Sequence, residues 1–248
     1  MLRRPTAVLT VLLASALGVT DALAAPPAGD VILFNPSASS TDPSVKTLVG
    51  RDKLAPAESR RILDAVFGGR YLTSEHQCQG VGPSLASSRQ AGDFTPSVLE
   101  QARGSFTAPQ RTQTLYLITD GECGATHADN WGSITLAVLE AGAVVAGTII
   151  DGGSSIRRVV DIDGDGRNEV VLTSGFANQG SVVESARLVR METTGLTVIH
   201  DFGQIFTSNC DGGLEPRAQT ISVVHAMTAP GAAATFRLEP RTERCAEP

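Results

Sequence analysis

The sequence predicts a mainly β fold of antiparallel sheets with propeller-blade-like repeats, together with a small α/β extension at the N-terminus. From about Thr112 onward, short runs rich in β-branched residues alternate with Gly and Asp turns, which is the pattern of strands joined by hairpins. The 248 residues include 25 Gly and 13 Pro without a Gly-X-Y period, which argues against an all-helical bundle and against collagen. A content of 42% apolar and 19% charged residues is typical of a folded chain.

The first 24 residues have the layout of a secretory signal peptide. Arg3 and Arg4 precede an apolar run over residues 7–19, and Ala22-Leu23-Ala24 supplies small residues for cleavage after Ala24. The run is shorter than the ~20 residues that a membrane-spanning helix needs, and no Cys lies near the cleavage point for lipid attachment. We therefore expect a secreted or periplasmic mature chain, with the α/β extension over residues 25–110 and a β-rich domain over residues 111–248.

The mature chain is acidic. Without residues 1–24 it has 18 basic and 25 acidic residues, and so a formal net charge of −7. Because no basic cluster offsets this charge, we expect no nucleic-acid partner. The most apolar later stretch, residues 134–150, is interrupted by Glu140, Gly142 and Gly147, which indicates two strands and a turn and no membrane span.

Four cysteines remain in the mature chain, at positions 78, 123, 210 and 245. An even number in an exported protein predicts two disulfides, for which three connectivities are possible. We favour Cys78–Cys123 and Cys210–Cys245, because loop-closure entropy mildly favours partners that are near in sequence. Zinc is the competing interpretation, since Cys123 and His127 are four residues apart and His76 is close to Cys78, but no Cys-x-x-Cys pair accompanies them.

The extension contains a predicted strand at residues 31–34, a loop over residues 37–45 and one helix at residues 56–67. Pro56 suits the first turn of this helix, Glu58 favours the positive end of its dipole, and Gly68-Gly69 end it. The apolar stripe that indicates its packing face consists of Leu54, Ile62, Val66 and Phe67.

The β-rich part shows a weak internal repeat. Its predicted strands cover residues 115–118, 134–139, 144–150, 170–172, 187–191 and 196–199. Gly132-Ser133 aligns with Gly180-Ser181, and Gly142 aligns with Gly195, at offsets of 48 and 53 residues. A repeat of ~40–50 residues has the size of a propeller blade, whose apolar face is buried by stacking on its neighbours. Chance similarity between Gly-containing hairpins is the alternative explanation.

The segment 161–169 reads Asp-Ile-Asp-Gly-Asp-Gly-Arg-Asn-Glu and has four carboxylates within nine residues. Acids at positions 161, 163 and 165 allow a tight loop to direct three carboxylates at one point, and Gly164 and Gly166 permit the backbone angles of the turn. These charges repel one another without a cation, and hard oxygen ligands in this number suit calcium better than magnesium. We therefore predict a calcium site, with a solvated acidic turn without metal as the alternative.

The loop is not an EF-hand, because its twelfth position is Leu172 instead of Glu and because β-branched runs adjoin it. Its strand–loop–strand arrangement, closed by an acid at the ninth position, resembles the calcium loops of integrin-alpha-type FG-GAP repeats and of the related VCBS-like repeats. Their pattern is roughly Asp-x-Asp/Asn-x-Asp-Gly-x-x-Asp. The resemblance implies a calcium ion held by the side chains of Asp161, Asp163, Asp165 and Glu169 and by the main-chain carbonyl of Arg167.

The resemblance covers only the loop and the strands beside it. Glu169 stands where the family usually has Asp, and its extra methylene either allows bidentate ligation or loosens the site. In the other candidate blade, the segment Asp120-Gly121-Glu122-Cys123 has too few acids for a metal site.

No catalytic frame is apparent in the sequence. HExxH, GxSxG and P-loop motifs are absent, and the four His, at positions 76, 127, 200 and 225, match no such pattern. We therefore expect no catalytic residues and a structural calcium ion that stabilises the folded state. The expected function is that of a monomeric, secreted interaction module whose partner is a protein or a glycan.

Two other functions stay open. One is a periplasmic or extracellular hydrolase with a site at residues 120–131, where the polar residues Asp120, Glu122, His127 and Asp129 gather around Cys123 and Trp131. The other is a small structural or inhibitory protein stabilised mainly by its two disulfides.

Overall fold

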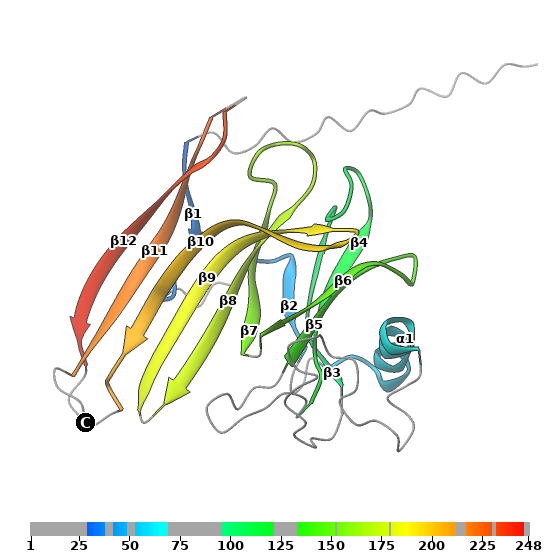
Figure 1. Ribbon diagram of the computed structural model, residues 1–248, viewed down its shortest axis with the longest axis horizontal. Helices are drawn as coiled ribbons and strands as arrows, with labels where there is room; N and C mark the ends of the chain where they lie inside the picture. The colour runs from blue at the N-terminus through cyan, green and yellow to red at the C-terminus, as the bar shows by residue number, and fades with distance from the viewer. Residues whose placement is uncertain are drawn as a thin grey trace, which may run out of the picture.

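The computed structural model describes residues 29–37, 42–48, 53–68, 96–121, 133–151, 153–178, 180–211, 217–229 and 232–245. Over these residues the predicted mainly β fold of antiparallel sheets is confirmed (Figure 1). The strands are β1 (Gly29–Phe34), β2 (Val45–Thr47), β3 (Ser97–Gly104), β4 (Gln113–Thr119), β5 (Ser133–Glu140), β6 (Ala143–Asp151), β7 (Ser154–Val160), β8 (Glu169–Asn178), β9 (Ser181–Glu192), β10 (Gly195–Ser208), β11 (Ala218–Thr228) and β12 (Thr235–Arg244).

The described strands form two sheets. The large sheet has the order β1-β11-β10-β9-β8-β7, with β12 paired to β11, and the small sheet has the order β2-β3-β4-β5-β6. The large sheet is curled into a half-barrel (Figure 1), and its ends approach each other where Arg158 of β7 donates a hydrogen bond to the Ile32 carbonyl of β1. Residues from the predicted extension thus enter both sheets, and the boundary predicted at residues 110–111 lies between the paired neighbours β3 and β4.

The single helix of the described residues, α1 (Pro56–Phe67), has the bounds that the sequence predicts. Gly68 ends it in the left-handed conformation, with φ of 62°, and donates its N–H to the Asp64 carbonyl. The buried side chains of α1 pack on the face of the small sheet that points away from the large sheet (Figure 1). Among the described residues, no helix has the length and apolar character needed to cross a membrane.

The small sheet is apolar on both faces because its central strands lie between two layers. In β4, Leu115 and Leu117 pack toward the large sheet, whereas Tyr116 and Ile118 pack toward α1. The large sheet shows the same alternation at β8, where Leu172 faces the small sheet and Val171 faces the inside of the curl. This explains why both strands read as continuous apolar runs.

The two passages aligned as a repeat form hairpins in different sheets. Residues 133–151 make the β5–β6 hairpin of the small sheet, and residues 181–208 make the β9–β10 hairpin of the large sheet. The strand predicted to end at Ile199 continues to Ser208, so His200 lies within β10. Register shifts near Val198, Asp201 and Gln204 bend the strand and let it follow the curl of the sheet.

One predicted disulfide is confirmed. Cys210 follows β10 and Cys245 follows β12, and their sulfur atoms are bonded, with the Cα atoms 5.4 Å apart. The bond connects the ends of two strands that both pair with β11. Cys78 and Cys123, and the zinc alternative that involves them, lie outside the described residues.

Candidate metal centre

The acidic segment forms the loop between β7 and β8. Asp161 comes directly after β7, and Glu169 is the first residue of β8, where it pairs with Val160. Gly164 and Gly166 adopt φ angles of 74° and 82°, a left-handed backbone that glycine accepts without a steric cost. The predicted strand–loop–strand arrangement is therefore confirmed.

Backbone amides of the loop hold its carboxylates in place. Asp161 accepts hydrogen bonds from the N–H groups of Gly164 and Gly166, at 2.7 and 3.0 Å. The Asp165 N–H donates to Asp163 at 3.2 Å, and the Ile162 N–H donates to Glu169 at 2.9 Å. Because each carboxylate oxygen has two lone pairs, these bonds orient the acids and leave acceptor capacity for a cation.

Three acids converge. One oxygen each of Asp161, Asp163 and Glu169 lie within 4.8 Å of one another. Two oxygens that bind one calcium ion at ~2.3–2.6 Å are separated by at most about 5 Å, so this spacing fits a shared cation. Glu169 is fully buried, whereas Asp161 is half-buried and Asp163 is exposed, so the group reaches from the protein interior to the surface.

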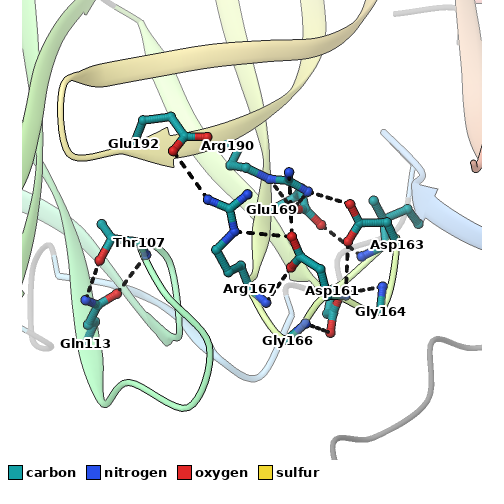
Figure 2. Close-up of polar contacts among 12 residues, drawn as sticks. Thr107, Gln113, Asp161, Asp163, Gly164, Gly166, Arg167, Glu169, Arg190 and Glu192 are labelled. Atoms are coloured by element: carbon teal, nitrogen blue, oxygen red, sulfur yellow. Dashed lines mark hydrogen bonds and ion pairs between the residues drawn. The ribbon is translucent and has the colours of Figure 1, made fainter.

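Asp165, which the resemblance implies as a ligand, is not in this convergent group. It accepts a hydrogen bond from the Arg167 N–H at 2.8 Å and forms an ion pair with the Arg167 guanidinium at 3.2 Å. The Arg167 side chain also reaches Glu192, at 3.3 Å, so it lies between the loop and the end of β9 (Figure 2).

Sequence reasoning missed Arg190, which projects from β9 into the acidic loop (Figure 2). Its Nη2 lies 2.7 Å from Asp163 and 2.6 Å from Glu169, and its Nε lies 2.8 Å from the same Glu169 oxygen. Its Nη1 lies 3.7 Å from Asp165. No sequence signal identifies this residue, because it is 21 positions from Glu169 and belongs to another strand.

Burial and Arg190 act in opposite directions on the loop acids. Burial raises the pKa of Glu169, and the Ile162 amide and Arg190 only partly offset this effect. Burial also tends to raise the pKa of Asp163, but the hydrogen bonds from Arg190 and from the Asp165 amide outweigh it and hold the pKa below its usual value. Desolvation tends to lower the pKa of Arg190, but the bonds to Asp163 and Glu169 raise it overall, so this guanidinium stays charged.

Asn168 connects the loop to the small sheet, and sequence reasoning assigned it no role. Its Oδ1 accepts the Ser105 N–H at 2.7 Å, and its own N–H donates to the Ser105 carbonyl at 2.7 Å. Ser105 directly follows β3, so the loop is anchored to the small sheet through Asn168 and to β9 through Arg190.

The alternative site at residues 120–131 is described only as far as Gly121. Asp120 is 1% exposed and accepts hydrogen bonds from the hydroxyls of Ser133 and Thr135, both at 2.9 Å. Burial raises its pKa to about 6, against the effect of these two donors. Glu122, Cys123, His127, Asp129 and Trp131 lie outside the described residues.

The two described histidines lie away from the acidic loop. His225 is bonded to Asp30 at 2.9 Å on the β1–β11 pair, with Glu239 of β12 at 3.4 Å. His200 packs its ring on Phe202 and Phe236.

None of the protein-family models, curated proteins or solved structures compared with this chain matches it. The resemblance of the loop to FG-GAP and VCBS-like repeats therefore stays a prediction, and the function is argued from the site itself.

Proposed function

We propose that this chain is an exported calcium-binding β protein that acts as a monomeric interaction module, with calcium in a structural role at the β7–β8 loop. The observation that carries this proposal is the convergence of Asp161, Asp163 and Glu169 within 4.8 Å on a loop whose backbone amides already orient the carboxylates. Such preorganisation lowers the cost of collecting like charges around an ion.

The charge balance of the loop supports a divalent cation. Its four carboxylates, in their ionised form, face two guanidinium groups, those of Arg167 and Arg190. The carboxylates therefore outnumber the guanidinium groups, and a divalent cation reduces the negative charge that remains. Among the described residues no arginine is bonded to Asp161, so this acid contributes charge without a cationic partner.

The position of the loop supports a structural role for the ion. Asn168 and Ser105 connect the loop to the small sheet, and Glu169 begins a central strand of the large sheet. A cation bound there joins ligands that are close together only in the folded state, so it stabilises that state by mass action.

A cavity at the junction of the two sheets supports binding over catalysis. It has a volume of about 210 Å³. Its lining combines five apolar side chains and three hydroxyl side chains with Arg187, and no carboxylate or imidazole of the described residues belongs to it. This composition supplies contact area and hydrogen bonds for a protein side chain or a sugar, but no acid–base pair.

Thermal unfolding of the chain from Ala25 onward tests the calcium proposal. At about a hundredfold excess over Kd, calcium stabilises the fold by about 3 kcal/mol, which corresponds to a melting temperature roughly 5–10 °C higher than with chelator. Asp161→Asn removes the negative charge of one proposed ligand, and it should abolish the rise in melting temperature that calcium causes. Asp201→Asn is the matched control. Asp201 also accepts a hydrogen bond from a nearby backbone N–H, that of Gly203, but it lies outside the loop. Equal melting temperatures of the native protein with calcium and with chelator would contradict the proposal.

A further inference from the structure

Arg190 stands where an ion shared by Asp163 and Glu169 would stand. Its Nη2 bridges one oxygen of each acid, at 2.7 and 2.6 Å (Figure 2). The Arg190 side chain is 17% exposed, and it comes from β9, two residues before the turn that joins β9 to β10. The guanidinium is therefore inserted among the carboxylates, while part of the side chain is exposed to solvent.

Calcium and this guanidinium cannot occupy the group together. Calcium requires direct contact with carboxylate oxygens at ~2.3–2.6 Å, which places it close to the Nη2 that bridges Asp163 and Glu169. Two positive charges at such a separation in a partly buried site repel strongly. The other two acids of the loop are Asp161 and Asp165, of which Asp165 is paired with Arg167 and lies outside the convergent group.

We propose that Arg190 is an internal competitor for the calcium site, so that calcium binds by exchange with the guanidinium and not by addition to it. This inference rests on the proposed calcium function. Without calcium, Arg190 neutralises the fully buried Glu169 and ties the loop to β9. With calcium, the side chain leaves the carboxylates, and β9 loses this connection. Arg190 thus sets the calcium affinity of the site, although it is not a ligand.

Calcium affinity, measured by calorimetry, tests the exchange in variants of the mature chain. Arg190→Met keeps an unbranched side chain and removes the competing charge, so it should bind calcium about tenfold or more tightly than the native protein. It should also melt at a lower temperature in chelator, because Glu169 loses its partner. Arg187→Met is the matched control on the same strand: Arg187 pairs with Asp201 at 3.3 Å outside the loop, and its removal should leave the affinity unchanged.

A second measurement uses the native side chain and does not depend on the folding of Arg190→Met. The NMR signal of the Arg190 Nε–H group, identified by its loss in Arg190→Lys, should report a hydrogen bond to Glu169 in chelator and should shift toward solvent-exposed values as calcium is added. Calcium binding with an unchanged Nε–H signal, or with equal or weaker affinity in Arg190→Met, would overturn the exchange and leave the calcium site intact. Absence of calcium binding in every protein would instead remove the proposed function and the exchange with it.

Discussion

Asp120 carries a buried charge that no basic side chain of the described residues offsets. It lies at the end of β4, and its two oxygens accept hydrogen bonds from Ser133 and Thr135 of β5. Burial raises its pKa from 3.8 to about 6. The folded state therefore binds this proton more tightly than the unfolded state does, and stability is lost as the pH rises from about 4 to 6.

Asp120→Asn should remove this pH dependence. The Asn side chain offers an acceptor to one of the two hydroxyl groups and a donor to the other, and burying it involves no desolvation of a charge. Above pH 6 the variant should be more stable than the native protein by up to about 3 kcal/mol, and below pH 4 the difference should vanish. Denaturant unfolding across this pH range measures the difference. Exposed Asp211→Asn is the control, and equal pH profiles for Asp120→Asn and the native protein would contradict the assignment.

At the residue scale, the sequence predicts those parts of the candidate site that are local. The alternation of acids and glycines over residues 161–166 is sufficient to predict the turn and its left-handed glycines, whereas the role of Glu169 was implied by the resemblance to FG-GAP and VCBS-like loops. Two arginines explain where the site differs from the prediction: Arg167 of the loop pairs with Asp165, and Arg190 supplies positive charge from another strand. Spacing along one segment contains no information about that strand.

At the scale of elements, Gly104 limits how closely the end of β3 approaches the acidic loop. A Cβ atom added at Gly104 would lie 2.7 Å from the Asn168 Oδ1 and 3.0 Å from the Phe106 ring. Both neighbours are fixed, since Asn168 is bonded to Ser105 and Phe106 is fully buried. The contact between the small sheet and the loop thus depends on the absence of a side chain at this position.

Gly104→Ala should lower the free energy of unfolding by about 1–3 kcal/mol, because the added methyl group overpacks a fixed contact. Gly175→Ala in β8 is the matched control. There the new Cβ would meet only the Val183 carbonyl, at 3.9 Å, which is an ordinary contact. Because alanine also lowers the conformational entropy of the unfolded chain, the stability should stay unchanged or rise slightly. Urea unfolding of the two variants makes the comparison, and equal stabilities would show that the loop is not packed against β3 as described.

Elements that are marked by residues of their own segment were predicted well. The elements that were missed depend on their pairing with other strands. The bounds of α1 follow from Pro56 and Gly68, whereas β2, β3, β11 and β12 were not predicted. In β3 the buried residues are Val98, Glu100 and Ala102, so a carboxylate stands among the apolar positions, and the register shifts between Val98 and Glu100. In β12 most residues are exposed and Pro240 lies mid-strand, which an edge strand tolerates.

At the scale of the whole molecule, polar contacts join the two sheets beside the acidic loop. Glu100 of β3 accepts the Ile156 N–H of β7 at 2.6 Å, and Asp42 accepts the Val159 N–H at 3.0 Å. Both contacts hold β7, the strand that leads into the loop. Ion binding at the loop is therefore expected to stabilise the junction of the sheets as well as the turn itself.

The pairing of strands that are distant in sequence was the least predictable feature of the fold. β1 pairs with β11 across almost 200 positions of sequence, with Gly29 opposite Thr228, and local patterns cannot reveal such a partner. Nor does spacing alone show which hairpins share a sheet, so the two aligned passages gave no indication that they belong to different sheets.

Calorimetric titration of the chelator-stripped chain from Ala25 onward is the most direct test of calcium binding at the β7–β8 loop. We expect saturable binding of about one calcium ion per chain, in line with one convergent group of three acids, and loss of this binding in Asp161→Asn. A titration without binding heat, together with unchanged unfolding in calcium, would contradict the claim and leave residues 161–169 as an acidic turn neutralised by Arg190.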